Sequence, residues 1–161
     1  NKLFGEKSLA GAFNVYDLLQ KSRFNKSFAV AAGQHLEYSW DKTADGAYDI
    51  AIHGPNGYYQ KLVSRGGVEP LKIKISYSAK SNLLIYIESI SSKSKEIIVQ
   101  NAYTKRNQTV SLKPNKSTTI EINTQDFGRW YDVTLKVEGW QRQYAGRMEN
   151  GKPSISDPLM A

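Results

Sequence analysis

Few residues of this sequence have the type and spacing that catalysis or metal binding requires. The chain has two histidines, His35 and His53, and no cysteine. Neither histidine has further ligands at the spacing of a metal site, so we expect both to be structural. No Gly-x-Ser-x-Gly elbow and no glycine-rich phosphate loop occurs. We therefore expect no catalytic residue, no metal and no cofactor in this chain.

Two carboxylates, Asp49 and Asp132, each follow a tyrosine at the start of an alternating apolar segment. They could act as an acid–base pair only if the two segments faced each other. The simpler interpretation is that each carboxylate accepts hydrogen bonds from backbone amides of a nearby turn.

Aromatic and basic residues suggest a second kind of site, a contact with a sugar or with a lipid surface. Exposed aromatic rings stack on sugars or settle at a lipid interface, whereas inward-facing rings belong to a core. Alternation places Trp40, Tyr48 and Tyr131 on apolar faces. It does not decide whether Tyr59 and Trp140 belong to the core or to the surface. An ion pair of Arg147 with Glu149 or Asp132 is the structural alternative to a lipid-phosphate contact. The candidate surface-contact residues are Tyr58, Tyr59, Trp140, Arg142 and Arg147.

Composition narrows the class of protein. The 161 residues carry a formal charge of +7, from 22 Lys and Arg against 15 Asp and Glu, and 40% of them are hydrophobic. No run of four basic residues occurs, so the charge favours weak attraction to an anionic or zwitterionic surface over nucleic-acid binding. No apolar run approaches 18 residues, and residues 1–7 do not resemble a signal peptide.

The pattern of the chain is that of short β-strands separated by turns. Apolar residues alternate with polar ones in most segments, and no 3.6-residue periodicity is sustained, which is typical of all-β sandwiches. Asn56-Gly57 predicts a tight hairpin turn. The expected strands are 12–16, 27–31, 35–40, 48–52, 58–63, 71–77, 82–89, 95–103, 109–112, 118–122, 130–137 and 141–147, and the inward face of 82–89 is ambiguous.

The chain also contains an internal repeat. Gly46 to His53 and Gly128 to Val137 share a glycine, an aromatic-Asp pair and alternating apolar residues, about 82 positions apart. The glycines and proline of 64–70 mark a linker, so we expect two tandem antiparallel β-sandwich-like repeats, residues 1–66 and 67–161.

Aligning the two repeats places Trp40 on Ile122 and Val15-Tyr16 near Ala102-Tyr103, with residue 1 near Glu88. The first repeat then lacks its two opening strands. Either upstream residues are absent from this sequence, or residues 1–10 and a neighbouring module cover the exposed edge.

Three segments resemble the C-terminal domain of bacterial phosphocholine-preferring phospholipases C. They are residues 11–17, the hairpin of residues 48–58 and the closing motif of residues 130–158. In that family the domain occurs as two tandem copies after a large catalytic domain. Tyr58 to Lys61 depart from the Phe- and Arg-rich sequence usual after the hairpin, which argues against a fixed basic site there.

The resemblance implies a secreted or periplasmic parent enzyme that cleaves phosphatidylcholine or sphingomyelin and releases phosphocholine. Its metal ligands and nucleophile belong to the catalytic domain, so we expect this chain to be a non-catalytic module. Its partners would be that catalytic domain and a phospholipid surface, with no nucleic acid. The alternatives are a carbohydrate- or cell-surface-binding module and a purely structural appendage.

Overall fold

The computed structural model describes residues 9–20 and 25–160. It confirms the all-β prediction, because the described residues form antiparallel strands and short 3₁₀ turns with no α-helix. No helix in these residues is long and apolar enough to cross a bilayer. The strands are β1 (Gly11–Asp17), β2 (Lys26–Val30), β3 (Ala47–His53), β4 (Tyr59–Arg65), β5 (Leu71–Tyr77), β6 (Leu83–Ser89), β7 (Lys95–Asn101), β8 (Arg106–Leu112), β9 (Ser117–Ile122), β10 (Trp130–Val137) and β11 (Trp140–Arg147), with 3₁₀ turns η2 (Gln125–Phe127) and η3 (Pro158–Met160).

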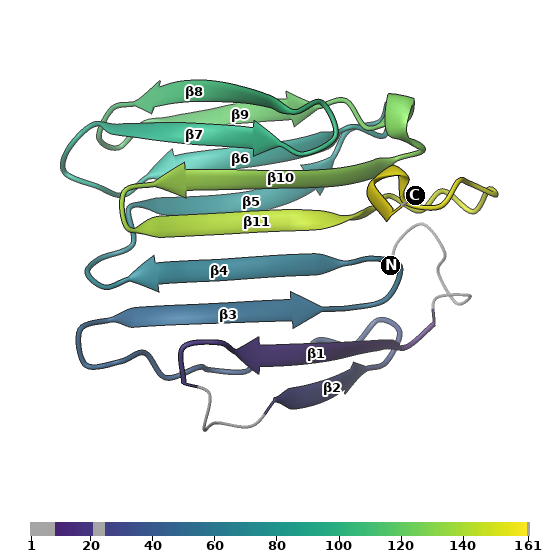
Figure 1. Ribbon diagram of the computed structural model, residues 1–161, viewed down its shortest axis with the longest axis horizontal. Coiled ribbons are helices and arrows are strands. Elements are labelled where there is room, and N and C mark those ends of the chain that lie inside the picture. The colour runs from purple at the N-terminus through teal and green to yellow at the C-terminus, as the bar shows by residue number, and fades with distance from the viewer. Residues whose placement is uncertain (1–8, 21–24, 161) are drawn as a thin grey trace.

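Eight strands form one sheet in the order β2-β1-β3-β4-β11-β10-β7-β8, and β5-β6-β9 form a second sheet. In Figure 1 the smaller sheet lies behind the strands of the second half, β11, β10, β7 and β8. The strand order of the large sheet is symmetric, since β2-β1-β3-β4 runs from one edge to the centre as β8-β7-β10-β11 does from the other edge. The two halves meet where β4 pairs antiparallel with β11, with Leu62 opposite Arg142.

Equivalent hydrogen bonds occur at matching positions of the two halves. Asp17 Oδ1, at the end of β1, accepts from the amides of residues 19 and 20 at 3.1 and 2.8 Å. Asn101 Oδ1, at the end of β7, accepts in the same way from residues 103 and 104 at 3.0 and 3.3 Å. These turn-capping side chains were not predicted from the sequence.

The strand register corrects the predicted alignment at β1. Val15 lies opposite Ile52, as Val99 lies opposite Leu135. Val15 therefore corresponds to Val99, three positions before the predicted match at Ala102. The loops between the strands differ in length in the two copies, and short alternating segments tolerate such a shift without losing their pattern.

Two apolar cores match the two halves. The larger core lies between the two sheets and includes Leu83, Ile85 and Ile87 of β6, each 0% exposed. Burying each such side chain stabilises the fold by about 1.5–3 kcal/mol. The smaller core contains Val15, Tyr48 and Ile50, with Trp40 and neighbours packed against them. The division into units of residues 1–66 and 67–161 stays a prediction.

The expected strand at 35–40 is not formed. These residues alternate like a strand, but no described strand is hydrogen-bonded to them. Alternation reports which side chains face an apolar surface, and it is independent of whether the backbone has a partner. The expected match of residue 1 to Glu88 lies outside the described residues.

Candidate functional site

Arg142 lies at the centre of a polar cluster where the two halves of the sheet meet. Its position on β11 points to the inner face together with Trp140, two residues before it, and the whole residue is 7% exposed. The guanidinium donates to the carbonyl oxygen of Val63 on β4 at 3.2 Å and to the hydroxyl of Tyr48 on β3. It also pairs with the carboxylate of Glu69 at 3.2 Å. One side chain thus binds both halves of the chain.

Aromatic rings enclose this guanidinium. It lies 4.3 Å from the ring centroid of Trp140 and 5.3 Å from that of Tyr48, both within the range of cation–π attraction. The Tyr48 hydroxyl donates to Glu69 at 2.5 Å, and Lys42 lies 3.7 Å from the same carboxylate. No pattern in the sequence predicted a role for Glu69, which stands in the linker between the repeats.

The pKa values of Tyr48 and Glu69 in the cluster shift in opposite directions. Burial raises the pKa of Tyr48, and its hydrogen bond to Glu69 raises it further. Burial also acts to raise the pKa of Glu69, but the Tyr48 hydroxyl and the charges of Arg142 and Lys42 outweigh burial and hold that pKa below its usual value. Glu69 is therefore ionised at neutral pH, and the cluster is a satisfied ion pair.

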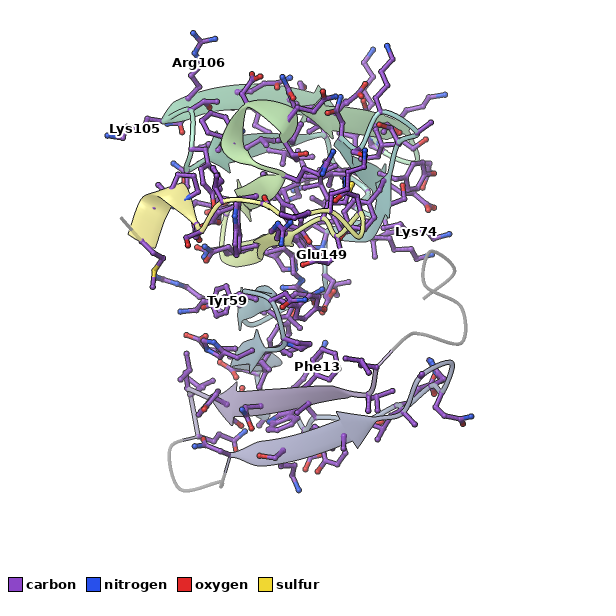
Figure 2. The ribbon with its side chains drawn as sticks, turned by 90° about the vertical axis from the view of Figure 1, so that its right-hand side faces the viewer. Phe13, Tyr59, Lys74, Lys105, Arg106 and Glu149 are labelled. Atoms are coloured by element: carbon purple, nitrogen blue, oxygen red, sulfur yellow. The ribbon has the colours of Figure 1, made fainter. Side chains whose placement is uncertain are left out.

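Tyr58 and Arg147 lie together at one end of the sheet. The Tyr58 ring meets Phe13 edge-on at 5.6 Å between centroids, and Arg147 pairs with Glu149 at 3.1 Å, as predicted. These residues line a cavity of about 250 Å³ with Tyr77 and Tyr131. In Figure 2, Glu149 lies above Phe13, and both residues line this cavity. Burial raises the pKa of both Tyr58 and Tyr131.

Tyr59 lies on the outer face of the sheet, where its ring is 4.9 Å from that of His53. Beside it, Asp132 accepts a hydrogen bond from the amide of Gln143 at 2.8 Å. Burial raises the pKa of Asp132. A groove of about 290 Å³ opens there, lined by polar side chains that include Gln100, Asn101, Asn107, Asp132, Thr134 and Gln143.

The predicted turn-capping role of Asp49 and Asp132 is wrong. The contacts of both carboxylates are with side chains, at 3.6 Å from Lys61 for Asp49 and at 2.8 Å from Gln143 for Asp132. The reason is that both carboxylates stand inside strands, on the outer face, where the neighbouring backbone amides belong to the sheet ladder.

The five candidate contact residues thus lie in three places. Trp140 and Arg142 are 5% and 7% exposed at the seam between the halves, Tyr58 and Arg147 are partly buried at the sheet end, and Tyr59 is partly buried on the outer face. The structure brings Trp140 and Arg142 together, and Tyr58 and Arg147 together. Contact of these residues with a surface stays a prediction. In the described residues, no group of three or more His, Asp or Glu is placed to hold a metal ion.

Comparison with known proteins identifies the family. The family model for the C-terminal domain of bacterial phospholipase C matches residues 2–63. A non-hemolytic phospholipase C of Pseudomonas aeruginosa is 30% identical over 98% of this chain. The chain is a C-terminal domain of the bacterial phospholipase C family.

Two further relatives agree with this assignment. A non-hemolytic phospholipase C of Burkholderia pseudomallei is 26% identical over 86% of the chain, and a hemolytic phospholipase C of P. aeruginosa is 27% identical over 73% of it. The chain spans about a quarter or less of each relative, at 25%, 23% and 18% of their lengths. The domain thus corresponds to only a part of each of these phospholipases C.

Proposed function

We propose that this chain is a non-catalytic module of a bacterial phospholipase C and that it packs on the catalytic domain of the same protein. The main support is the match of nearly the whole chain to about a quarter of a phospholipase C. The parent protein would hydrolyse phosphatidylcholine or sphingomyelin and release phosphocholine, and it would be secreted or periplasmic.

The arrangement of the polar groups supports a scaffold role. The most buried cation, Arg142, is neutralised by Glu69 and enclosed by Trp140 and Tyr48. A guanidinium that is already paired and covered by rings holds the two halves of the module together. A charged group that served a substrate would instead face a cavity that the substrate can enter.

Packing on the catalytic domain is tested by calorimetry on the longer protein with and without this module. We expect removal of the module to lower the unfolding temperature of the catalytic domain, because a packed neighbour stabilises the domain that it covers. An unchanged unfolding temperature would contradict the packing.

Association with a lipid surface is the second part of the proposal. The net charge of +7 favours weak attraction to a membrane. Tyr58, Tyr59 and Arg147 retain accessible surface and are the residues that would meet it. Co-sedimentation with phosphatidylcholine vesicles tests this part. Tyr59→Ala should weaken binding, and Ser76→Ala, an uncharged change at an exposed position of the edge strand β5, is the control.

The outer groove favours a carbohydrate-binding function as the alternative. Amide and carboxylate side chains beside a tyrosine ring are the groups that bind sugar hydroxyls and stack on sugar rings. Saturable binding to a glycan that Gln143→Ala abolishes, together with no binding to vesicles, would favour this alternative. Binding to neither would leave the scaffold role.

A further inference from the structure

The inner face of the large sheet is covered differently in its two halves. Over the second half lies the three-stranded sheet, with its central strand β6 fully buried. Over the first half, the described part of the chain places residues 34–40, whose side chains line a cavity together with residues of β1 to β4. This cavity has a volume of about 420 Å³ and is lined mostly by apolar side chains.

Residues 35–40 are the counterpart of β9. The turns that precede the two segments match, because Gln34 N donates to the carbonyl of Ala31 at 3.0 Å and Lys116 N donates to that of Lys113 at 3.2 Å. Gly33 and Asn115, one residue earlier in each turn, both have positive φ angles, of 72° and 55°. His35 to Trp40 thus correspond to Ser117 to Ile122, position by position.

The two counterparts differ in their backbone partners. Each residue of β9 is paired antiparallel with a residue of β6. No backbone hydrogen bond joins residues 35–40 to any other described residue. Trp40 holds the segment in place instead, through its indole N–H, which donates to Asp17 Oδ2 at 2.9 Å. The segment therefore offers an unpaired strand edge to a further strand.

Two aromatic side chains that line the cavity are more exposed than their counterparts in the second half. Tyr38 is 51% exposed, whereas its counterpart Ile120 is 6% exposed. Phe13 on β1 is partly exposed, whereas Ile97 on β7 is 0% exposed. The apolar face of the first copy is thus built to the same plan as the second, but the residues that the structure describes include no equivalent of β5 and β6.

We propose that a two-stranded hairpin, formed by chain that precedes β1 and that begins before Asn1 in the longer protein, fills this cavity and pairs with residues 35–40. Its second strand runs antiparallel to the 35–40 segment, as β6 does to β9. Its inward side chains are apolar and alternate, as Leu83, Ile85 and Ile87 do in β6. The first copy then becomes a complete sandwich like the second.

Chain order supports this occupant. In the second copy β6 directly precedes β7, and β7 is the counterpart of β1. The strand that precedes β1 in the chain is therefore the topological equivalent of β6. The relative that matches 98% of the chain aligns through only 25% of its own length, so chain outside this structure is available in the family.

Two other occupants explain less of the site. A lipid acyl chain would fill the apolar cavity but would leave the backbone groups of residues 35–40 without partners. A second copy of this chain could add one strand to the edge, but it would not supply the second strand that the first copy lacks.

Hydrogen exchange on the longer protein tests the proposal, with the present 161-residue chain as reference. We expect the amides of residues 35–40 to exchange at least about tenfold more slowly in the longer protein, approaching the rate of residues 117–122. Equal rates in the two proteins would overturn the proposal. So would protection that appears in the 161-residue chain only at high protein concentration, which would indicate a second copy, or only with phosphatidylcholine vesicles, which would indicate a lipid.

A pair of matched substitutions gives an independent readout. Leu36 lines the cavity and is 45% exposed, and Leu159 lies near the C-terminal end and is 48% exposed. In the longer protein, Leu36→Asp should lower the unfolding temperature more than Leu159→Asp does, by about 4 °C or more, whereas in the 161-residue chain the two should differ little. An equal effect of the two substitutions in the longer protein would count against a covering hairpin.

Discussion

Replacing Arg142 should destabilise the domain more than replacing any exposed arginine. Arg142→Ala removes the ion pair with Glu69, the hydrogen bond to the Val63 carbonyl and the stacking on Trp140. Breaking a buried ion pair by deleting one partner costs about 3–5 kcal/mol. Glu69 is 35% exposed and keeps Lys42 at 3.7 Å, so the carboxylate that remains is partly solvated and partly paired. We therefore expect the lower end, about 3 kcal/mol.

For a domain of this size, that loss corresponds to a fall in unfolding temperature of roughly 6–12 °C. Urea denaturation and calorimetry measure it. Arg106 is exposed on β8, as Figure 2 shows, so Arg106→Ala is the matched control and should change stability by less than about 0.5 kcal/mol. Combining Arg142→Ala with Glu69→Gln should cost less than the sum of the two single changes, because they remove the same pair. A loss for Arg142→Ala no larger than for Arg106→Ala would refute the idea that this cluster joins the two halves.

Three further predictions follow from the described geometry. The pKa of Glu69 is held below its usual value. The stability that the Glu69 carboxylate contributes is therefore present above about pH 4.5 and is lost as the pH falls through the lowered pKa. Glu69→Gln should flatten the acid side of a plot of unfolding free energy against pH. Burial raises the pKa of Tyr144 to about 12, so its contribution is present below about pH 10 and is lost as pH rises towards 12; Tyr144→Phe should reduce the alkaline loss, and an unchanged slope in alkaline urea titrations would contradict this. Gly57 has a φ of 70° and a Cβ there would lie 2.5 Å from the Trp130 ring, whereas Gly33 has a φ of 72° and open space around it. In thermal unfolding, Gly33→Ala should show only the cost of the left-handed backbone, about 1 kcal/mol, and Gly57→Ala should cost clearly more.

Much of the fold could be predicted from alternation alone. Residues 71–77 show the period of two that a half-buried strand requires, and they form β5. Residues 83–87 form most of β6, but Leu84 and Tyr86 leave the inward face of that strand undecided in the sequence. The repeated Tyr-Asp motif identified the two copies. Alternation also places Arg142 opposite to Gln141 and Gln143, which favours an apolar surface or an ion pair for its side chain, and the structure shows the ion pair.

The remaining features depend on contacts between distant parts of the chain. The pairing of β4 with β11 joins the edge strands of the two halves of the large sheet. No residue pattern in either strand predicts which strand it pairs with. Glu69 reaches Arg142 from a glycine-rich linker, where no periodic pattern exists to place a side chain. Residues 35–40 show the opposite failure, because their side chains follow strand alternation while their backbone has no partner strand among the described residues.

The central proposal is that this domain carries no catalytic activity of its own and serves the catalytic part of a phospholipase C. The most direct test is hydrolysis of phosphatidylcholine by the purified 161-residue chain, measured beside the longer protein. We predict phosphocholine release by the longer protein and no release above background by this chain. Turnover that follows the purified chain through successive columns, and that is lost when the chain is unfolded, would contradict the proposal.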